Sequence, residues 1–314
     1  MAATNDALWA LVLAGGDGVR LREFTRLIAG APIPKQYCRI TGDRSLLQMT
    51  LSRIRPSVPD SRMLVVVNRD HLALARPQLA GLPRANVVVQ AANRDTGPGL
   101  VLGLSHLCRR DPRAIVVVLP SDHYVHDEVA FRRYVGLARD VVRRQPHRIA
   151  LLGIAPDRPD PGYGYVTTRP VDDVECPATY DVQAFEEKPS AEAAARLVAD
   201  GALWSSLVMV FRVERMLELL VRVLPGALRG VRDIPPWNLS RDFLAHVPQH
   251  LVVVRADDLG WNDLGTPESV ERTLVELGRD VPWRSDTQRP GAEPEPPDRE
   301  RVSRSEHRLE GVVG

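Results

Sequence analysis

Short apolar runs alternate with segments of helical spacing along the first half of the chain. The runs that predict buried strands cover residues 7–13, 63–67, 87–89 and 115–119. The segments that place apolar side chains on one helical face cover residues 45–54, 100–108 and 131–142. This alternation predicts an α/β fold, a Rossmann-like, mostly parallel sheet flanked by helices, with ligands bound beyond the carboxyl ends of the strands.

The second half of the chain has a mixed pattern. The turn-rich stretch PDRPDPGYGYVTTRP, which begins at residue 156, predicts a loop followed by a strand. We expect further strands at 181–187, 207–211 and 251–254. Helical spacing covers residues 191–200, 213–224 and 268–277. Residues 279–314 mix prolines, arginines and acids with scarcely any apolar spacing, which predicts a disordered tail.

The composition and net charge argue against some classes of binding partner. The 314 residues are 44% hydrophobic, and 41 basic against 40 acidic residues leave a net charge of +1. A balanced charge gives no global attraction for nucleic acid or an acidic membrane, so we expect neither as a partner. Without a span of about 18 apolar residues or a signal-like start, a cytoplasmic protein is expected. Cys38, Cys108 and Cys176 are too widely spaced for a zinc cluster and are expected to be reduced thiols.

Lysine is almost absent from the chain. Only Lys35 and Lys188 are lysines, and every other basic residue is arginine. A coding bias toward arginine explains most of this pattern. The two positions that kept lysine are therefore candidates for a role that needs a compact ammonium group and not a planar guanidinium.

A glycine-rich loop follows the first predicted strand. Its sequence, LAGGDGVRL (residues 13–21), has neither the Gly-Lys-Ser/Thr of a Walker A loop nor the spacing of a dinucleotide fingerprint. Residues without Cβ let backbone N–H groups approach an anion closely, and Arg20 can add a bidentate clamp on phosphate. A purely structural turn is the alternative.

Two carboxylates stand in turns that suit a hard cation. Asp122 follows the apolar run at 115–119, and Asp263 lies in a glycine-flanked turn just before an expected helix N-cap at Thr266. The alternative for Asp122 is a helix cap or an ordinary turn residue.

Several motifs follow one another in an order that resembles a known family. They are LAGGDGVRL, PIPKQY, SLLQMTLSRI, NRDTGPG, LPSDHYV, GIAPDRPDPGYGYV, FEEKPS and GWNDLGTPES, between about Ala10 and Leu277. Together they resemble the sugar-1-phosphate nucleotidyltransferases, and most closely the bacterial mannose-1-phosphate guanylyltransferases. The resemblance implies a glycosyltransferase-A-like fold. It also implies one domain over residues 1–278, with a nucleotide-binding half (1–155) and a sugar-phosphate half (156–278).

The resemblance implies a reaction and a set of site residues. An NTP, GTP by likeness, would react with a sugar 1-phosphate, mannose 1-phosphate by likeness, to give GDP-mannose and pyrophosphate. The implied catalytic residues are Arg20, Lys35, Asp122 and Lys188, and the implied Mg²⁺ ligands are Asp122 and Asp263. The implied nucleotide-binding residues are Leu13, Ala14, Gly15, Gly16, Gly18, Arg20, Lys35, Asn93, Arg94 and Thr96. The implied sugar-phosphate residues are Gly164, Glu187, Lys188 and Ser205. A homodimer is left open.

Three stretches depart from the family's usual sequence: the loop at Val19, the segment at residues 205–207, and residues 22–31, where Trp-Pro-Leu-Ser-Arg is usual. Val19 stands where threonine is usual, Ser205 where asparagine is usual and Leu207 where glycine is usual. Ser205 and Leu207 leave open a sugar other than mannose. Val19 and Leu207 keep a second hypothesis open, in which the protein is a catalytically reduced homologue that binds nucleotide or sugar phosphate as a regulator or partner subunit.

Overall fold

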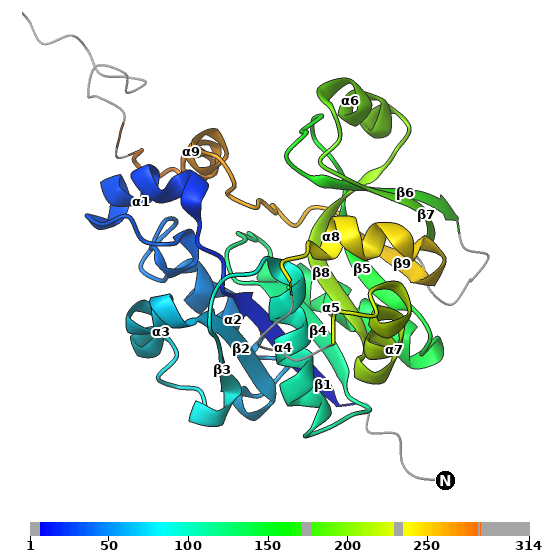
Figure 1. Ribbon diagram of the computed structural model, residues 1–314. Coiled ribbons are helices and arrows are strands. Elements are labelled where there is room, and N and C mark those ends of the chain that lie inside the picture. The colour runs from blue at the N-terminus through cyan, green and yellow to red at the C-terminus, as the bar shows by residue number, and fades with distance from the viewer. Residues whose placement is uncertain (1–6, 171–177, 229–234, 282, 284–314) are drawn as a thin grey trace, which may run out of the picture.

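A nine-stranded sheet forms the centre of the molecule (Figure 1). The computed structural model describes residues 7–170, 178–228, 235–281 and 283. The strands are β1 (Leu8–Ala14), β2 (Met63–Asn68), β3 (Val87–Gln90), β4 (Ile115–Pro120), β5 (Ile149–Ile154), β6 (Gly164–Pro170), β7 (Thr179–Glu187), β8 (Leu203–Arg212) and β9 (Leu251–Ala256). Their order across the sheet is β3-β2-β1-β4-β8-β5-β9-β7-β6.

The strand order reverses between β1 and β4. Strand β1 pairs in parallel with both β2 and β4, so the chain builds β2 and β3 on one side of β1 and then crosses to the other side. Such a reversal opens a crevice beyond the carboxyl ends of the two strands. Strand β8 inserts antiparallel between β4 and β5, which makes the sheet mixed. The predicted fold class is confirmed.

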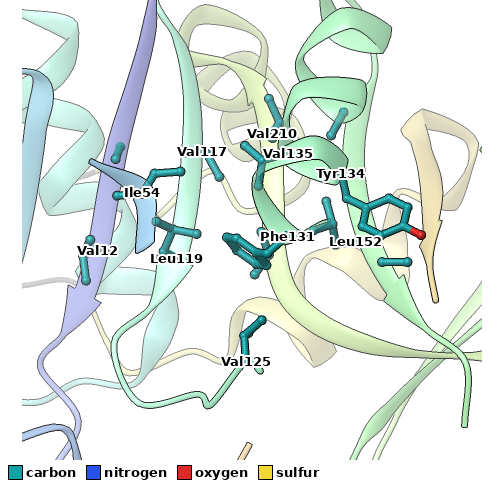
Figure 2. Packing of buried hydrophobic residues seen from close by; sticks show 14 of the residues in the cluster. Val12, Ile54, Val117, Leu119, Val125, Phe131, Tyr134, Val135, Leu152 and Val210 are labelled. Carbon is teal, nitrogen blue, oxygen red and sulfur yellow. The ribbon is translucent and has the colours of Figure 1, made fainter. Parts of the chain in front are cut away.

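Helices cover both faces of the sheet. They are α1 (Arg22–Ala29), α2 (Leu46–Ile54), α3 (Leu72–Gln78), α4 (Thr96–Cys108), α5 (Glu128–Arg144), α6 (Ala191–Ala199), α7 (Val213–Val223), α8 (Leu239–Asp242) and α9 (Pro267–Glu276). Apolar side chains of α2, α3 and α5 share one core with one face of the strands, and those of α4 and α7 share another core with the opposite face. Figure 2 shows the first core, where Phe131 of α5 lies among Leu119, Val125 and Leu152.

A third, smaller core joins the two ends of the folded chain. Phe24 of α1 packs with Val270 and Leu274 of α9, and the two helices lie side by side in Figure 1. Trp283 stacks edge-on against Phe24, with ring centroids 4.1 Å apart, so the folded body continues past residue 278. The rest of the predicted tail, residues 284–314, lies outside the described residues.

Several elements did not emerge from the sequence pattern. Strand β5 and helices α1, α3 and α8 had no predicted counterpart, and β8 begins four residues before the expected strand at 207–211. The expected N-cap is present, because the Thr266 side chain accepts a hydrogen bond from the Ser269 N–H.

Cys38 and Cys108 are free thiols, and Cys176 lies outside the described residues. Within the described ranges, none of the helices combines the length and apolar character needed to cross a membrane.

The core of Figure 2 gives a stability prediction. Phe131 is 2% exposed, and we expect Phe131→Ala to lower the free energy of unfolding by about 3–5 kcal/mol because it removes a buried ring and leaves a cavity. Val129→Ala on the same helix is the control, since Val129 is 70% exposed, and it should change the value by less than about 0.5 kcal/mol. Urea unfolding measures both, and equal effects would contradict the assignment of Phe131 to the core.

Candidate active site

A cavity of about 460 Å³ lies beyond the carboxyl ends of β1 and β4, at the point where the strand order reverses. Seven of the predicted site residues line it: Leu13, Gly15, Gly16, Asn93, Arg94, Thr96 and Asp122. The position is the one that an open α/β sheet offers to a ligand. The cavity therefore brings the glycine-rich loop, the Asn93–Thr96 segment and one predicted carboxylate together.

The glycine-rich loop is fixed by neighbouring side chains. The carbonyl of Ala14 accepts hydrogen bonds from the Gln36 side chain (3.2 Å) and the Tyr37 hydroxyl (2.9 Å), and Gln36 also donates to the Gly16 carbonyl (2.7 Å). Gly18 has φ +58°, a left-handed conformation that costs glycine little, and a Cβ there would lie 3.2 Å from the Lys35 backbone nitrogen. The loop conformation is thus set before any ligand binds.

Asp17 ties this loop to the other side of the cavity. Its carboxylate accepts hydrogen bonds from Asn93 (2.9 Å) and from Asn68 at the end of β2 (3.3 Å). Asn93 in turn accepts a bond from the backbone N–H of Asp95 (3.0 Å), the N-cap residue of α4. Two predicted nucleotide-binding segments that are distant in sequence are therefore held by one carboxylate.

Lys35 lies at the meeting point of the two predicted carboxylate segments. Its ammonium group is 3.3 Å from Asp122 Oδ2, and it also donates to the backbone carbonyls of Asp263 and Leu264, the latter at 3.3 Å. An isolated pair of backbone hydrogen bonds between Tyr124 and Asn262 (2.8 and 3.0 Å) holds the two segments side by side. The structure thus brings together Lys35, the Asp122 carboxylate and the backbone of the Asp263 turn, whereas Lys188, the second rare lysine, is not among the residues that line the cavity.

The charges around Asp122 favour its ionised form. Burial by itself raises the pKa of this carboxyl, but the Lys35 ammonium, through its charge and its hydrogen bond, opposes burial, and the pKa is lowered from its ordinary value. Burial lowers the pKa of His123, and its ring packs edge-on against Trp261 with centroids 5.3 Å apart. At neutral pH the cavity wall therefore holds an ionised Asp122 and a neutral imidazole.

The Asp263 carboxylate is held by a phenol. Asp263 Oδ1 accepts hydrogen bonds from the Tyr163 hydroxyl (3.0 Å) and from the backbone N–H of Gly265 (2.8 Å). Burial, and then the charge of Asp263, raise the pKa of Tyr163, so the phenol stays protonated and donates.

The predicted sugar-phosphate residues gather at the start of β6 and the end of β7, outside the cavity lining. Gly164 pairs with Glu187 across these strands, and a Cβ on Gly164 would lie 2.7 Å from Glu187 Oε2. The Lys188 ammonium is 3.7 Å from Glu187 Oε1, and the Lys188 side chain is half exposed. Burial raises the pKa of Glu187, and Lys188 opposes that rise. Ser205 lies on β8, where its hydroxyl accepts a bond from the Leu207 N–H (3.4 Å).

Two predicted residues stand apart from these contacts. Arg20 is exposed on a short 3₁₀ turn, Val19–Leu21, and within the described residues its side chain makes no ion pair or hydrogen bond. Ala14 is buried and contributes only its carbonyl to the loop. Neither residue lines the cavity.

Unusual backbone conformations cluster around the site. Among the described residues, six that are not glycine have positive φ, and four of them lie here: Asp95 (+72°), Lys188 (+52°), Leu207 (+58°) and Leu264 (+51°). Each such residue costs on the order of 1–2 kcal/mol, and strained residues of this kind concentrate at functional sites. Leu207, which the sequence analysis noted as standing at a glycine position, lines the cavity in a conformation that glycine adopts freely.

Several lining residues were missed by the sequence analysis: Gln36, Gln90, Asp95, Ser121, His123 and Pro236. Gln36, Asp95, Ser121 and His123 lie within the motifs PIPKQY, NRDTGPG and LPSDHYV, so membership of these motifs was the available signal. Pro236 had no signal, because its segment reaches the cavity through tertiary contacts such as the 3.1 Å hydrogen bond from the Leu239 N–H to the Thr96 hydroxyl.

Comparison with known proteins agrees with this fold. The family model described as nucleotidyl transferase matches residues 9–278, so the chain belongs to the nucleotidyl transferase family. The family resemblance drawn from the motifs is confirmed.

Two curated relatives and one solved structure illustrate the similarity. The mannose-1-phosphate guanylyltransferase of Escherichia coli K12 is 32% identical over 289 residues, which cover 84% of this chain and 59% of that protein. The xanthan biosynthesis protein XanB of Xanthomonas campestris pv. campestris is 30% identical over 282 residues, 83% of this chain and 58% of that protein. A crystal structure described as a mannose-1-phosphate geranyltransferase from Thermus thermophilus is 28% identical, with a TM-score of 0.74, over 87% of this chain and 80% of that one. The chain thus spans under three fifths of the length of these two curated relatives.

The Lys35 contacts give a prediction for stability and its pH dependence. Lys35→Ala leaves the Asp122 carboxylate and two carbonyls without their donor, and we expect a loss of about 1–3 kcal/mol at pH 7. The pKa of Asp122 is lowered in the folded protein, so the ion pair contributes its full stabilisation above about pH 4, the pKa of an unfolded aspartate. The ion-pair part of the loss therefore disappears as the pH falls through the pKa of Asp122 in the folded protein. Urea unfolding of both proteins at several pH values measures the difference, and a gap that widens in acid would contradict the pairing.

Proposed function

We propose that this chain transfers a nucleotidyl group from an NTP to a sugar 1-phosphate and releases pyrophosphate. GTP and mannose 1-phosphate are the proposed pair, giving GDP-mannose, because relatives named for that reaction match most of this chain. One observation supports the proposal most directly. The cavity between the glycine-rich loop and Asp122 lies where Lys35 joins the Asp122 and Asp263 segments. Residues 1–278 are proposed as the catalytic domain, with its nucleotide half at 1–155 and its sugar-phosphate half at 156–278.

The triphosphate is proposed to bind at the loop after β1. Backbone N–H groups of Gly15, Gly16 and Gly18 would bind phosphate oxygens, and the exposed Arg20 is free to swing toward them. Asn93, Arg94 and Thr96, on the other wall of the same cavity, would contact the nucleobase. Asp17, which accepts a hydrogen bond from Asn93, would hold the glycine-rich loop and the Asn93–Thr96 segment in fixed positions relative to each other.

The attacking group needs no general base. A sugar 1-phosphate is already largely dianionic at neutral pH, since its second pKa is about 6. What the reaction requires is the alignment of two mutually repelling anions, with neutralisation of charge at the α-phosphate and at the leaving pyrophosphate. Lys188 would bind the sugar phosphate, while Glu187, Ser205 and the backbone of Gly164 would contact sugar hydroxyls.

Asp122 and Asp263 are the proposed carboxylate ligands of a divalent cation that substrate also binds. Among the described residues, no group of three or more acid, histidine or cysteine side chains is placed to hold a metal ion. Mg²⁺ usually takes one or two carboxylates together with substrate phosphates and water, and Asp122 and Asp263 supply such a pair. When bound, Mg²⁺ would neutralise charge between the two phosphate groups. Lys35, which pairs with Asp122 here, would exchange that carboxylate for a phosphate oxygen.

Release of pyrophosphate tests the proposed function. The purified chain with Mg²⁺, GTP and mannose 1-phosphate should release pyrophosphate, and a panel of other NTPs and sugar 1-phosphates should react more slowly. Faster reaction with another pair would change the proposed substrates but not the reaction. Silence across the whole panel, together with binding of nucleotide or sugar phosphate by calorimetry, would favour the regulatory homologue that Val19 and Leu207 leave open.

Substitution of the two acids tests the cation site. Asp122→Asn and Asp263→Asn keep the side-chain shape but remove the charge, and each should lower kcat by about 100-fold or more. Asp127→Asn is the matched control, because Asp127 caps α5 through the N–H groups of Val129 and Ala130, and asparagine caps equally well. It should leave kcat unchanged. Circular dichroism checks the fold of each variant, and unchanged kcat in Asp122→Asn or Asp263→Asn would remove that residue from the cation site.

A further inference from the structure

Tyr163 occupies a position between the two halves of the proposed site. It lies in the loop between β5 and β6, directly before Gly164, where β6 begins. Its hydroxyl donates to Asp263 Oδ1 at 3.0 Å, across 100 residues of sequence.

The Tyr163 ring has little freedom to move. It is 7% exposed, and its centroid lies 4.6 Å from that of Trp204 and 5.5 Å from that of Trp261. Trp261 precedes Asp263 by two residues in the same turn. The Trp261 ring packs on the Tyr163 ring, and the Asp263 carboxylate accepts a hydrogen bond from the Tyr163 hydroxyl. The position of the hydroxyl is therefore fixed relative to the carboxylate that it bonds.

The main chain of Tyr163 reaches the other half of the site. Its carbonyl accepts a hydrogen bond from the Lys188 N–H at 3.1 Å, and Lys188 has φ +52°, a conformation that a lysine holds only when its surroundings impose it. The side chain of one residue thus holds Asp263 and its backbone holds Lys188.

We propose that Tyr163 is a positioning residue: it orients the Asp263 carboxylate toward a divalent cation and couples that orientation to the placement of Lys188. This inference rests on the proposed function, in which Asp263 holds the cation and Lys188 the sugar phosphate. Hydrogen bonds from neighbouring groups commonly orient the carboxylates that bind metal ions, and their loss weakens metal binding about 10–100-fold.

Tyr163→Phe keeps the packed ring and removes only the hydroxyl. The Mg²⁺ concentration for half-maximal rate should rise about 10-fold, with a smaller change in kcat at saturating Mg²⁺. A second readout does not depend on activity: binding of Mn²⁺ alone to the ligand-free protein, followed by electron paramagnetic resonance of free Mn²⁺, should weaken by a similar factor. Asp263→Asn gives the reference for a lost ligand.

Tyr165→Phe is the matched control. Tyr165 lies two residues further along the chain and is fully buried, and its hydroxyl bonds the backbone N–H (2.9 Å) and carbonyl (3.1 Å) of Asp160 instead of an acid of the site. The control should lower Tm while leaving the half-saturating Mg²⁺ concentration and Mn²⁺ affinity as in the unmodified protein.

The outcomes separate this inference from the proposed function. The positioning role would be overturned if Tyr163→Phe and the unmodified protein had the same cation dependence, even if nucleotidyl transfer is observed. It would also be overturned if Tyr163→Phe and Tyr165→Phe shifted the cation dependence equally. Failure of the unmodified protein to bind Mn²⁺ would overturn it as well. If no transfer is found but Tyr163→Phe still weakens Mn²⁺ binding, the proposed reaction fails and the positioning role stands.

Discussion

The ammonium group of Lys35 is the contact on which the site depends. It joins a segment that follows β4 to a turn 228 residues further along the chain from Lys35, through one carboxylate and two backbone carbonyls. A nearly buried ammonium needs such partners, because a charge that is removed from water without them is costly. The small size of the ammonium group matters, since three oxygens approach one nitrogen. A planar guanidinium would direct its donors differently, which gives a physical reason for a lysine here in a chain that otherwise uses arginine.

The strained residues show how the fold supports this contact. The Leu264 carbonyl accepts a hydrogen bond from Lys35 while Leu264 holds a positive φ, and Lys188 holds a positive φ at the opposite end of the site while it donates to Tyr163. The extensive apolar packing of the sheet and helices stabilises the fold enough to absorb these local costs. The site is therefore preorganised by the surrounding core and not by the intrinsic preferences of its own residues.

Much of the architecture followed from local pattern. The β-branched runs at 63–67 and 115–119 became fully buried parallel strands, because such side chains pack well on a sheet covered on both faces. The run at 87–89 became the parallel edge strand β3, where Val88 is buried and Val89 is exposed. Strand β5 was missed: its sequence, IALLGI, is a short apolar run that periodicity cannot assign to a strand or a helix. The insertion of β8 between β4 and β5 was equally invisible, since strand order depends on which edges meet in three dimensions.

The sequence by itself determined the class of fold, the glycine-rich loop, the two rare lysines and the acids that follow strands, because periodicity and turn chemistry are local properties of the chain. Only the tertiary structure decided that Lys35 bonds both acid segments, that Tyr163 holds Asp263, and that Pro236 reaches the cavity. These contacts join residues far apart along the chain, and their geometry follows from how sheet, helices and loops pack. No local pattern encodes that packing.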